Sequence, residues 1–201
     1  LIDTLNSSTT SLKDLINDIL DFSKIESREI IIDNQYFALK DLFESVYNMM
    51  SMRAEEKGIK FAFNFDDVKD QTFYGDQVRF RQILINLIVN AIKFTDKGQV
   101  SVTAVKEMYQ GKAHIRVDVA DTGIGVEQRD SNVIFEKFKQ GDASVSRRQG
   151  GTGLGLSISK NLANLMGGDI HLSWSEAGAG SVFTLELPII DEKTVIPQHA
   201  I

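Results

Sequence analysis

The 201-residue chain contains no cysteine, two prolines and no long apolar run. The absence of cysteine excludes disulfides, thiol catalysis and cysteine-based zinc sites, and agrees with a cytosolic setting. No run of residues is apolar enough to span a bilayer, and no signal peptide is found. Lysine and arginine (22) are fewer than aspartate and glutamate (28), so the net charge is −6. A main role in nonspecific nucleic-acid binding, which needs a basic surface, is therefore not expected.

The length suits one good-sized domain with an appendage, or two small domains. A hydrophobic content of 42% supports a real core. The chain begins with Leu1 rather than methionine, so we expect a fragment of a longer protein, with room for a membrane anchor outside it.

Residues 1–27 are expected to form a helix with a seam-like apolar stripe, because Leu5, Leu12 and Ile19 recur every seven residues. Two interpretations remain: a helix that packs on its own domain, or one helix of an intermolecular bundle. The second is favoured because the stripe precedes the globular part.

The rest of the chain alternates helical and strand patterns. Strands are expected at 30–37, 59–65, 98–107, 112–120, 169–175 and 181–187, and helices at 39–57, 76–94 and 152–167. Gly58 is the expected C-terminal cap of the helix at 39–57, and Asp76 the expected N-cap of the helix at 76–94. A long loop is expected at 122–151 and a tail from Asp191. The sum is an α/β two-layer sandwich, a mixed sheet with helices on one face, preceded by a long helix. The irregular order excludes a doubly wound sheet.

The helix at 76–94 carries Asn86, Asn90 and Lys93 on one face, since residues three and four apart are neighbours. A carboxamide oxygen suits Mg²⁺ bound alongside phosphates, so Asn90 is the candidate metal ligand. Asn86 would orient a water or the hydration shell of the metal, and Lys93 would contact a phosphate. The alternative is an ordinary polar helix face.

A glycine turn, Asp121-Thr-Gly-Ile-Gly125, follows an expected strand. The carboxylate of Asp121 can accept a hydrogen bond from an exocyclic amine such as that of adenine. Gly123 and Gly125 would let the backbone approach a flat ring. The same pattern is also an ordinary turn signal.

A second glycine run, Gly150–Gly155, opens the expected helix at 152–167. Free N–H groups and the helix dipole at that end favour phosphate oxygens. The spacing matches neither the dinucleotide fingerprint nor a P-loop. A simple hinge remains an alternative. The candidate ligands in this run are Gly151, Thr152, Gly153, Leu154 and Gly155.

The loop between the glycine segments carries Phe135 and Phe138, which could anchor it or simply be core aromatics. Arg147 and Arg148 could reach a phosphate or form a solvated basic pair.

Together these segments resemble the catalytic ATP-binding domain of sensor histidine kinases, within the GHKL ATPase superfamily. Asn86, Asn90 and Lys93 match its N box, Phe135 and Phe138 its F box, and the two glycine runs its two glycine boxes. Residues 17–26 resemble the end of the second dimerisation helix, a segment specific to histidine kinases. The resemblance covers nearly the whole chain.

The resemblance implies a Bergerat-type fold with ATP under a flexible lid. By position, Asn90 would bind Mg²⁺, Asn86 would lie where related ATPases place their general base, and Lys93 would contact the phosphates. Phe94 would lie near the adenine, Asp121 would bind the adenine amine, and Thr184 would contact the adenine through a water. Three regions are expected: the end of the dimerisation and phosphotransfer helix at 1–28, the catalytic domain at 29–190 and a linker or tail at 191–201.

The chain departs from the family pattern in three places. Val126 stands where a proline often follows the first glycine box, and Gln149 where an aromatic is common. The phosphoacceptor motif, a histidine followed by an acidic residue and shortly by proline, is absent, since neither Pro188 nor Pro197 has such a histidine before it. We therefore expect ATP binding without self-phosphorylation, with the acceptor histidine upstream of Leu1.

The resemblance implies a kinase that transfers the ATP γ-phosphoryl to a histidine on a domain absent from this chain. The implied partners are that phosphoacceptor domain, a response regulator or receiver domain, and a second copy in a homodimeric parent. The implied location is a cytoplasmic domain of a parent that can be anchored in the inner membrane. Two alternatives remain: a degenerate GHKL domain acting as a scaffold or binding module, and a GHKL ATPase that drives a conformational change.

Overall fold

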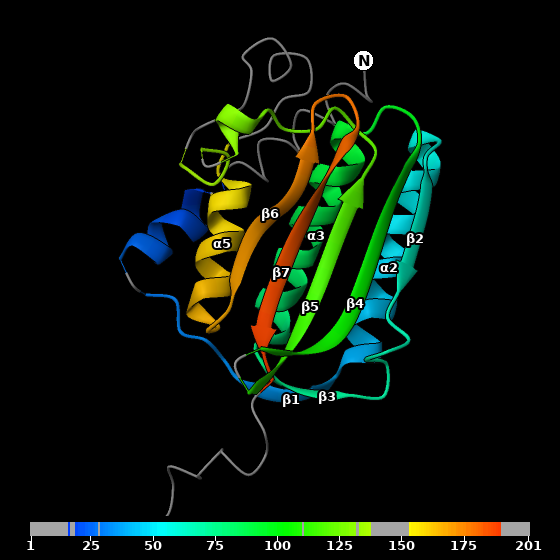
Figure 1. Cartoon of the computed structure of the whole chain (residues 1–201). Helices are drawn as coiled ribbons and strands as arrows, with labels where there is room; N and C mark the ends of the chain where they lie inside the picture. The colour runs from blue at the N-terminus through cyan, green and yellow to red at the C-terminus, as the bar shows by residue number, and fades with distance from the viewer. Residues whose placement is uncertain are drawn as a thin grey trace, which may run out of the picture.

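The computed structural model describes residues 16, 19–27, 29–109, 111–131, 133–137 and 153–189. These residues form two layers, a five-stranded sheet and a layer of helices that covers one of its faces (Figure 1). The helices of this layer are α2 (Leu39–Lys57), α3 (Gln77–Phe94) and α5 (Gly155–Leu165). The predicted α/β two-layer sandwich with helices on one face is confirmed.

The sheet is mixed, with the strand order β2-β4-β5-β7-β6. β2 pairs in parallel with β4, and every other pairing is antiparallel. The strands are β2 (Lys60–Asn64), β4 (Gln99–Tyr109), β5 (Lys112–Asp121), β6 (Asp169–Glu176) and β7 (Gly180–Pro188). These strands lie within a few residues of the predicted positions.

The central strand β5 shows how one sheet separates two environments. Ile115, Val117 and Val119 are buried against the helices, while the residues between them point to the other face. Asp121 continues the buried set at the end of the strand. The alternation therefore places a carboxylate on the helix side of the sheet.

Helix α3 lies between α2 and α5 and runs behind the sheet (Figure 1). Its predicted N-cap is confirmed, because Asp76 Oδ1 accepts a hydrogen bond from the Arg79 backbone N–H at 3.0 Å. The core side of α3 consists of buried aromatic and aliphatic residues: Phe80, Ile83, Leu84, Leu87, Ile88, Ala91 and Ile92. This burial leaves the flank with Asn86 and Asn90 for polar contacts.

Helix α2 ends as predicted at Gly58, which adopts the left-handed conformation at φ 73°. Within it Phe43 is fully buried and its ring centroid lies 5.5 Å from those of Phe63 and Phe65 and 6.0 Å from that of Phe80. This aromatic cluster joins α2, α3 and the sheet.

A small antiparallel ribbon of β1 (Gln35–Ala38) and β3 (Thr72–Gly75) lies below the main sheet (Figure 1). β3 was not predicted from the sequence, and the segment predicted as a strand over 30–37 is a strand only at its end. The reason is that the Asp33 N–H donates to Asp76 Oδ2 at 3.1 Å, and Ile31 is 85% exposed. Upstream of Gln35, the Asp33 N–H therefore bonds a side chain and not a neighbouring strand.

The predicted helix at 1–27 is described at Ile16 and from residue 19, and it is helical over 19–26. Its end contacts the same chain, because Gln82 Nε2 donates to Asp21 Oδ2 at 2.8 Å and Lys137 pairs with Glu26. Ile16, Ile19 and Leu20 are exposed. The last turns thus pack on their own domain, while the heptad residues Leu5 and Leu12 lie outside the described residues.

The predicted loop at 122–151 contains a short 3-10 helix, η1 (Gln128–Asp130), and turns at 133–137. Among the residues that the structure describes, no helix is both long enough and apolar enough to cross a membrane.

Candidate nucleotide-binding site

The polar flank of α3 faces α5. Asn86 Nδ2 donates to the hydroxyl of Ser159 at 2.7 Å, and Asn90 Nδ2 donates to Asn86 Oδ1 in a longer contact of 3.5 Å. The predicted set of two amides is therefore brought together, and a hydroxyl from another helix joins it. Ser159 was not predicted, because nothing in the sequence signals that α5 lies against this flank.

The approach of α5 to α3 depends on Gly155, the last residue of the second glycine run. A Cβ atom there would lie 2.5 Å from Asn86 Oδ1 and would displace the amide. Gly155 was predicted to contact the nucleotide. In the structure it also gives Asn86 the space that it occupies.

Lys93 lies near the C-terminal end of α3, half-buried beside Phe94. Its Nζ is 4.9 Å from the centroid of the Phe94 ring. Burial lowers the pKa of Lys93 below its ordinary value, because the ammonium loses contact with water. A lysine of this kind favours a ligand that supplies negative charge.

The carboxylate of Asp121 is 8% exposed at the end of β5. Gly123 donates its backbone N–H to Oδ1 at 2.8 Å, and the backbone N–H of Ser181 is a second donor to this carboxylate. Burial raises the pKa of Asp121, and the two N–H groups act against that rise. Two backbone donors thus fix the direction of a largely buried acceptor.

The glycine turn after Asp121 packs on the end of α3, because the Ile124 N–H donates to the Phe94 carbonyl at 3.2 Å. Gly125 has φ 67°, and a Cβ there would lie 2.1 Å from the Glu176 carbonyl. Only glycine fits both conditions. The contact brings the predicted adenine ligands, Asp121 and Phe94, to one end of the domain.

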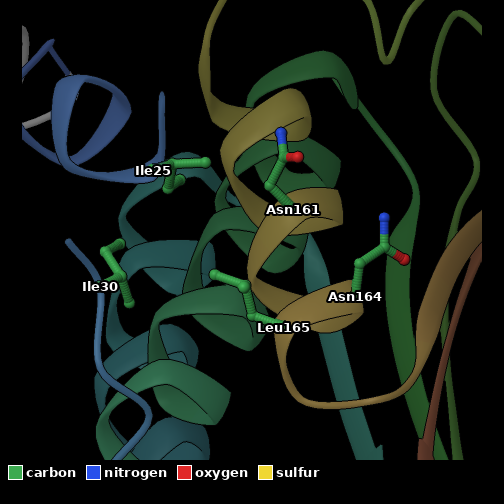
Figure 2. Close-up of a pocket in the computed structure, with 5 residues that line it drawn as sticks. All are labelled: Ile25, Ile30, Asn161, Asn164 and Leu165. Carbon is green, nitrogen blue, oxygen red and sulfur yellow. The ribbon is translucent and has the colours of Figure 1, made fainter. Parts of the chain in front are cut away.

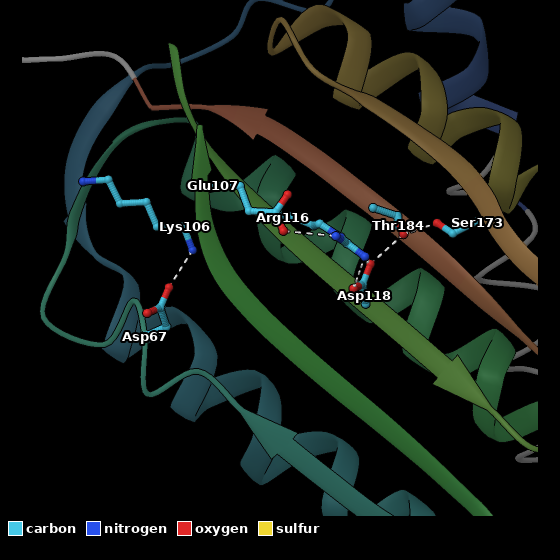
Figure 3. A network of polar contacts seen from close by, with 7 residues as sticks. All are labelled: Asp67, Lys106, Glu107, Arg116, Asp118, Ser173 and Thr184. Atoms are coloured by element: carbon cyan, nitrogen blue, oxygen red, sulfur yellow. Dashed lines mark hydrogen bonds and ion pairs between the residues drawn. The ribbon is translucent and has the colours of Figure 1, made fainter. Parts of the chain in front are cut away.

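The predicted role of Thr184 is not supported by its position. Its hydroxyl donates to Asp118 Oδ1 at 2.6 Å and contacts the Ser173 hydroxyl (Figure 3). Thr184 pairs with Asp118 in the register of β5 and β7, whereas Asp121 pairs with Ser181. Since Asp118 and Asp121 are three residues apart on one strand, Thr184 lies on the opposite sheet face from Asp121.

The buried hydroxyl beside Asp121 belongs to Ser181 instead. The backbone N–H of Ser181 donates to the Asp121 carboxylate, and the Ser181 Oγ lies 3.0 Å from the Ser175 Oγ. Ser181 was not predicted, because the register of β5 and β7 cannot be read from the strand pattern. A shift of three residues exchanges the two faces.

The outer sheet face holds a charged network around Thr184 (Figure 3). Arg116 contacts Glu107 at 3.0 Å and Asp118 at 2.8 Å. The network pairs the charges on that face among themselves, away from the amides of α3.

Several predicted site residues lie outside the described residues: Phe138, Arg147, Arg148, Gly151 and Thr152. The described end of the second glycine run has Gly153 at φ 69° and Leu154 buried at the start of α5. Phe135 of the F box is partly buried. Its ring centroid lies 6.2 Å from the Phe183 ring centroid and 5.0 Å from the Lys160 Nζ. The interpretation of Phe135 as an anchor of its loop agrees with these contacts.

A separate cavity of about 340 Å³ lies between α5 and the upstream segment that carries Ile25 and Ile30 (Figure 2). It is lined by Ile25, Ile30, Asn161, Asn164 and Leu165. The α5 residues among these follow helical spacing on the side opposite Gly155 and Ser159. The cavity is therefore part of the junction with the upstream segment and not of the amide cluster.

Comparison with known proteins agrees with this geometry. Residues 75–191 match the family model described as histidine kinase-, DNA gyrase B- and HSP90-like ATPase. This chain belongs to that family. The match includes α3, the Asp121 turn and the second glycine run, which are the segments that build the site.

Curated relatives of this chain include sensor histidine kinases. The signal transduction histidine-protein kinase BarA of Escherichia coli K12 is 41% identical over 184 residues, covering 90% of this chain and 20% of BarA. The chain thus spans about a fifth of the length of this curated relative.

Solved structures show the same fold. Full-length ShkA in complex with AMPPNP superposes with a TM-score of 0.77 at 34% identity, covering 94% of this chain and 38% of that one. Histidine kinase ThkA in complex with the response regulator protein TrrA superposes with a TM-score of 0.72 at 27% identity, covering 94% of this chain and 50% of that one.

Proposed function

We propose that this chain is the ATP-binding catalytic domain of a two-component sensor histidine kinase. It would transfer the ATP γ-phosphoryl to a histidine on a domain outside these residues. The observation that carries the proposal is the junction of the Asp121 turn with the end of α3, because it joins an adenine acceptor to the flank with Asn86, Asn90 and Lys93. The sequence similarity to BarA supports it.

Asp121 would accept a hydrogen bond from the adenine amine. Its carboxylate accepts hydrogen bonds from the N–H groups of Gly123 and Ser181 and is largely shielded from water. Phe94 would lie near the adenine. Buried polar groups of this kind discriminate strongly, since a base without the amine leaves the acceptor unpaired.

Asn90 would hold a magnesium ion together with the phosphates. Among the described residues, no group of three or more histidine, cysteine, aspartate or glutamate side chains could hold a metal ion. One neutral carboxamide oxygen fits Mg²⁺, which keeps waters and binds with substrate phosphates rather than in an all-protein cage. Bound there, the ion would neutralise charge on the phosphates.

Transfer would depend mainly on positioning and charge. Lys93 would contact the phosphates, with Arg147 and Arg148 as further counter-charges. Asn86 would orient a water or the hydration shell of the metal. The ligands Gly151, Thr152 and Gly153 would cradle the phosphates at the start of α5.

The partners of this domain would be a phosphoacceptor histidine domain and a response regulator or receiver domain, in a homodimeric parent anchored in the inner membrane. The ThkA structure contains a response regulator, which supports the second partner. The proposed division is a phosphotransfer helix at 1–28, a catalytic domain at 29–190 and a linker or tail at 191–201.

The decisive test is calorimetric titration of an ATP analogue with and without Mg²⁺, on the wild type and on Asp121→Asn. We expect binding that depends on Mg²⁺ and weakens about tenfold or more in the variant, since a hydrogen bond to a charged group contributes about 1.5–3 kcal/mol. A folded wild type that binds no nucleotide would contradict the proposal and favour the scaffold alternative.

The kinase assignment is tested by transfer from labelled ATP to an added phosphoacceptor domain. We expect acid-labile phosphate on that domain and none on this chain alone, because the chain lacks the phosphoacceptor motif. Labelling of this chain alone would contradict the second expectation. ATP hydrolysis without transfer would favour a conformational ATPase.

A further inference from the structure

We propose that Ser159 is a positioning residue for phosphoryl transfer, which acts by holding the carboxamide of Asn86. This inference rests on the proposed function. Ser159 lies outside both glycine boxes and the N box, and no ligand role was expected of it. Its importance follows from where α5 places its hydroxyl.

Two residues one helical turn apart on α5 form a seat for the Asn86 side chain. Gly155 lies against Oδ1, where a Cβ would approach to 2.5 Å, and Ser159 Oγ accepts from Nδ2 at 2.7 Å. Positions i and i+4 of a helix lie on one face, so both ends of the amide meet the same surface. The amide oxygen of Asn86 fits only because Gly155 has no Cβ, and the amide nitrogen is held by the hydrogen bond to Ser159.

The seat matters because an asparagine amide has little torsional preference of its own. The last torsion of asparagine is broad, so neighbouring groups decide where its oxygen and nitrogen point. With Nδ2 held by Ser159, Oδ1 is directed to Asn90 Nδ2 at 3.5 Å. A chain of contacts therefore runs from α5 through Asn86 to the proposed magnesium ligand.

Burial makes the contact between Ser159 and Asn86 hard to replace with water. Ser159 is 1% exposed, and buried polar groups are nearly always paired. Helix α5 begins at the end of the second glycine run, so the same helix would hold the phosphates at its first turn and Asn86 one turn later. Ser159 would thus align the two halves of the site.

The test compares Ser159→Ala with a matched control, Ser157→Ala. Ser157 is on the same helix and 2% exposed, but its hydroxyl donates to the Leu154 carbonyl of its own chain segment at 2.8 Å. We expect Ser159→Ala to lower the transfer rate about threefold to tenfold, the range of one net hydrogen bond, while the nucleotide Kd changes less than about twofold. Ser157→Ala should leave the transfer rate within about twofold.

A double-mutant cycle separates positioning from a general loss of stability. In an Asn86→Ala background, Ser159→Ala should have no further effect on the transfer rate, because the group that it positions is gone. Equal losses in both backgrounds, or an equal loss in Ser157→Ala, would overturn the proposal.

A measurement without nucleotide keeps this inference separate from the proposed function. The side-chain amide signal of Asn86 in a ¹H–¹⁵N spectrum should shift in Ser159→Ala and stay unchanged in Ser157→Ala. An unchanged signal in Ser159→Ala would overturn the contact itself. A wild type that neither binds nor transfers would instead refute the proposed function, and Ser159 would then have no transfer to position.

Discussion

At the scale of single residues, the site combines a half-buried cation, Lys93, and a buried anion, Asp121, at one end of α3. The pKa of Lys93 is lowered by burial, and that of Asp121 is raised by burial. Both shifts disfavour the charged form that the ligand needs. A bound nucleotide would restore each charge, so binding should be coupled to protonation at both ends of the pH scale.

Lys93 leads to a prediction at alkaline pH. Its lowered pKa means that the ammonium loses its proton below the ordinary value of 10.5, and affinity for the nucleotide phosphates should fall as pH rises through that region. The Lys93→Arg variant should keep its affinity over the same range, because a guanidinium stays charged. The measurement is nucleotide Kd against pH. Parallel curves for both proteins would contradict the prediction.

Asp121 leads to a prediction at acidic pH. Because its pKa is raised above 3.8, the carboxylate takes up a proton sooner than an ordinary aspartate as pH falls, and nucleotide affinity should begin to fall there. The control is Asp121→Asn, which has no carboxylate at this position, so protonation there cannot lower its affinity. Titrating both proteins with the same analogue removes the contribution of the nucleotide's own protonation. A wild-type decline no steeper than that of the variant would contradict the prediction.

At the scale of elements, α3 is hydrogen-bonded at both ends to other segments of the chain. At its C-terminus Lys57 Nζ donates to the carbonyls of Ile92 and Lys93, each at 2.7 Å. At its N-terminus Asp76 uses both carboxylate oxygens, one for the helix and one for the Asp33 N–H. The helix that carries the amides is thereby joined to the segment that leads in from upstream.

The two bonds of Asp76 can be separated by substitution. Asp76→Ala should lower the free energy of unfolding by about 1–2 kcal/mol, mainly through the lost helix cap. Asp76→Asn keeps one oxygen for the cap and should cost less, while the amide exchange of Asp33 should rise as it does in Asp76→Ala. Denaturant unfolding and hydrogen exchange check both. Unchanged exchange at Asp33 would show that the upstream segment is held by other contacts.

At the scale of the whole molecule, the aromatic cluster around Phe43 joins the helical layer to the sheet. The rings of Phe63, Phe65 and Phe80 surround it within 6.0 Å. These residues come from α2, the β2 region and α3, so the cluster fixes the sandwich at the edge away from α5 (Figure 1).

Removing the central ring should destabilise the domain strongly. We expect Phe43→Ala to reduce the free energy of unfolding by about 3–5 kcal/mol, the usual cost of a buried phenylalanine. Met52 on the same helix is 63% exposed, and Met52→Ala should change stability by less than about 0.5 kcal/mol. Chemical denaturation of both variants gives the comparison. Similar losses of unfolding free energy in the two variants would show that the aromatic cluster does not stabilise the core.

The amino-acid sequence by itself determined the elements and the chemistry of the ligands. Helical periodicity predicted α2 and α3 within a residue, the caps at Gly58 and Asp76 were confirmed, and the amide, acidic-glycine and glycine-run segments identified the family. These features are local: capping, periodicity and motif spacing depend on residues a few positions apart.

Only the tertiary structure decided which distant groups meet. The register of β5 and β7 put Ser181 beside Asp121 and Thr184 on the other face, and the packing of α5 on α3 gave Asn86 its partner in Ser159. The short strand β3 also depends on its pairing with β1. Such contacts join residues tens of positions apart through the packing of the whole core, and no local pattern encodes them.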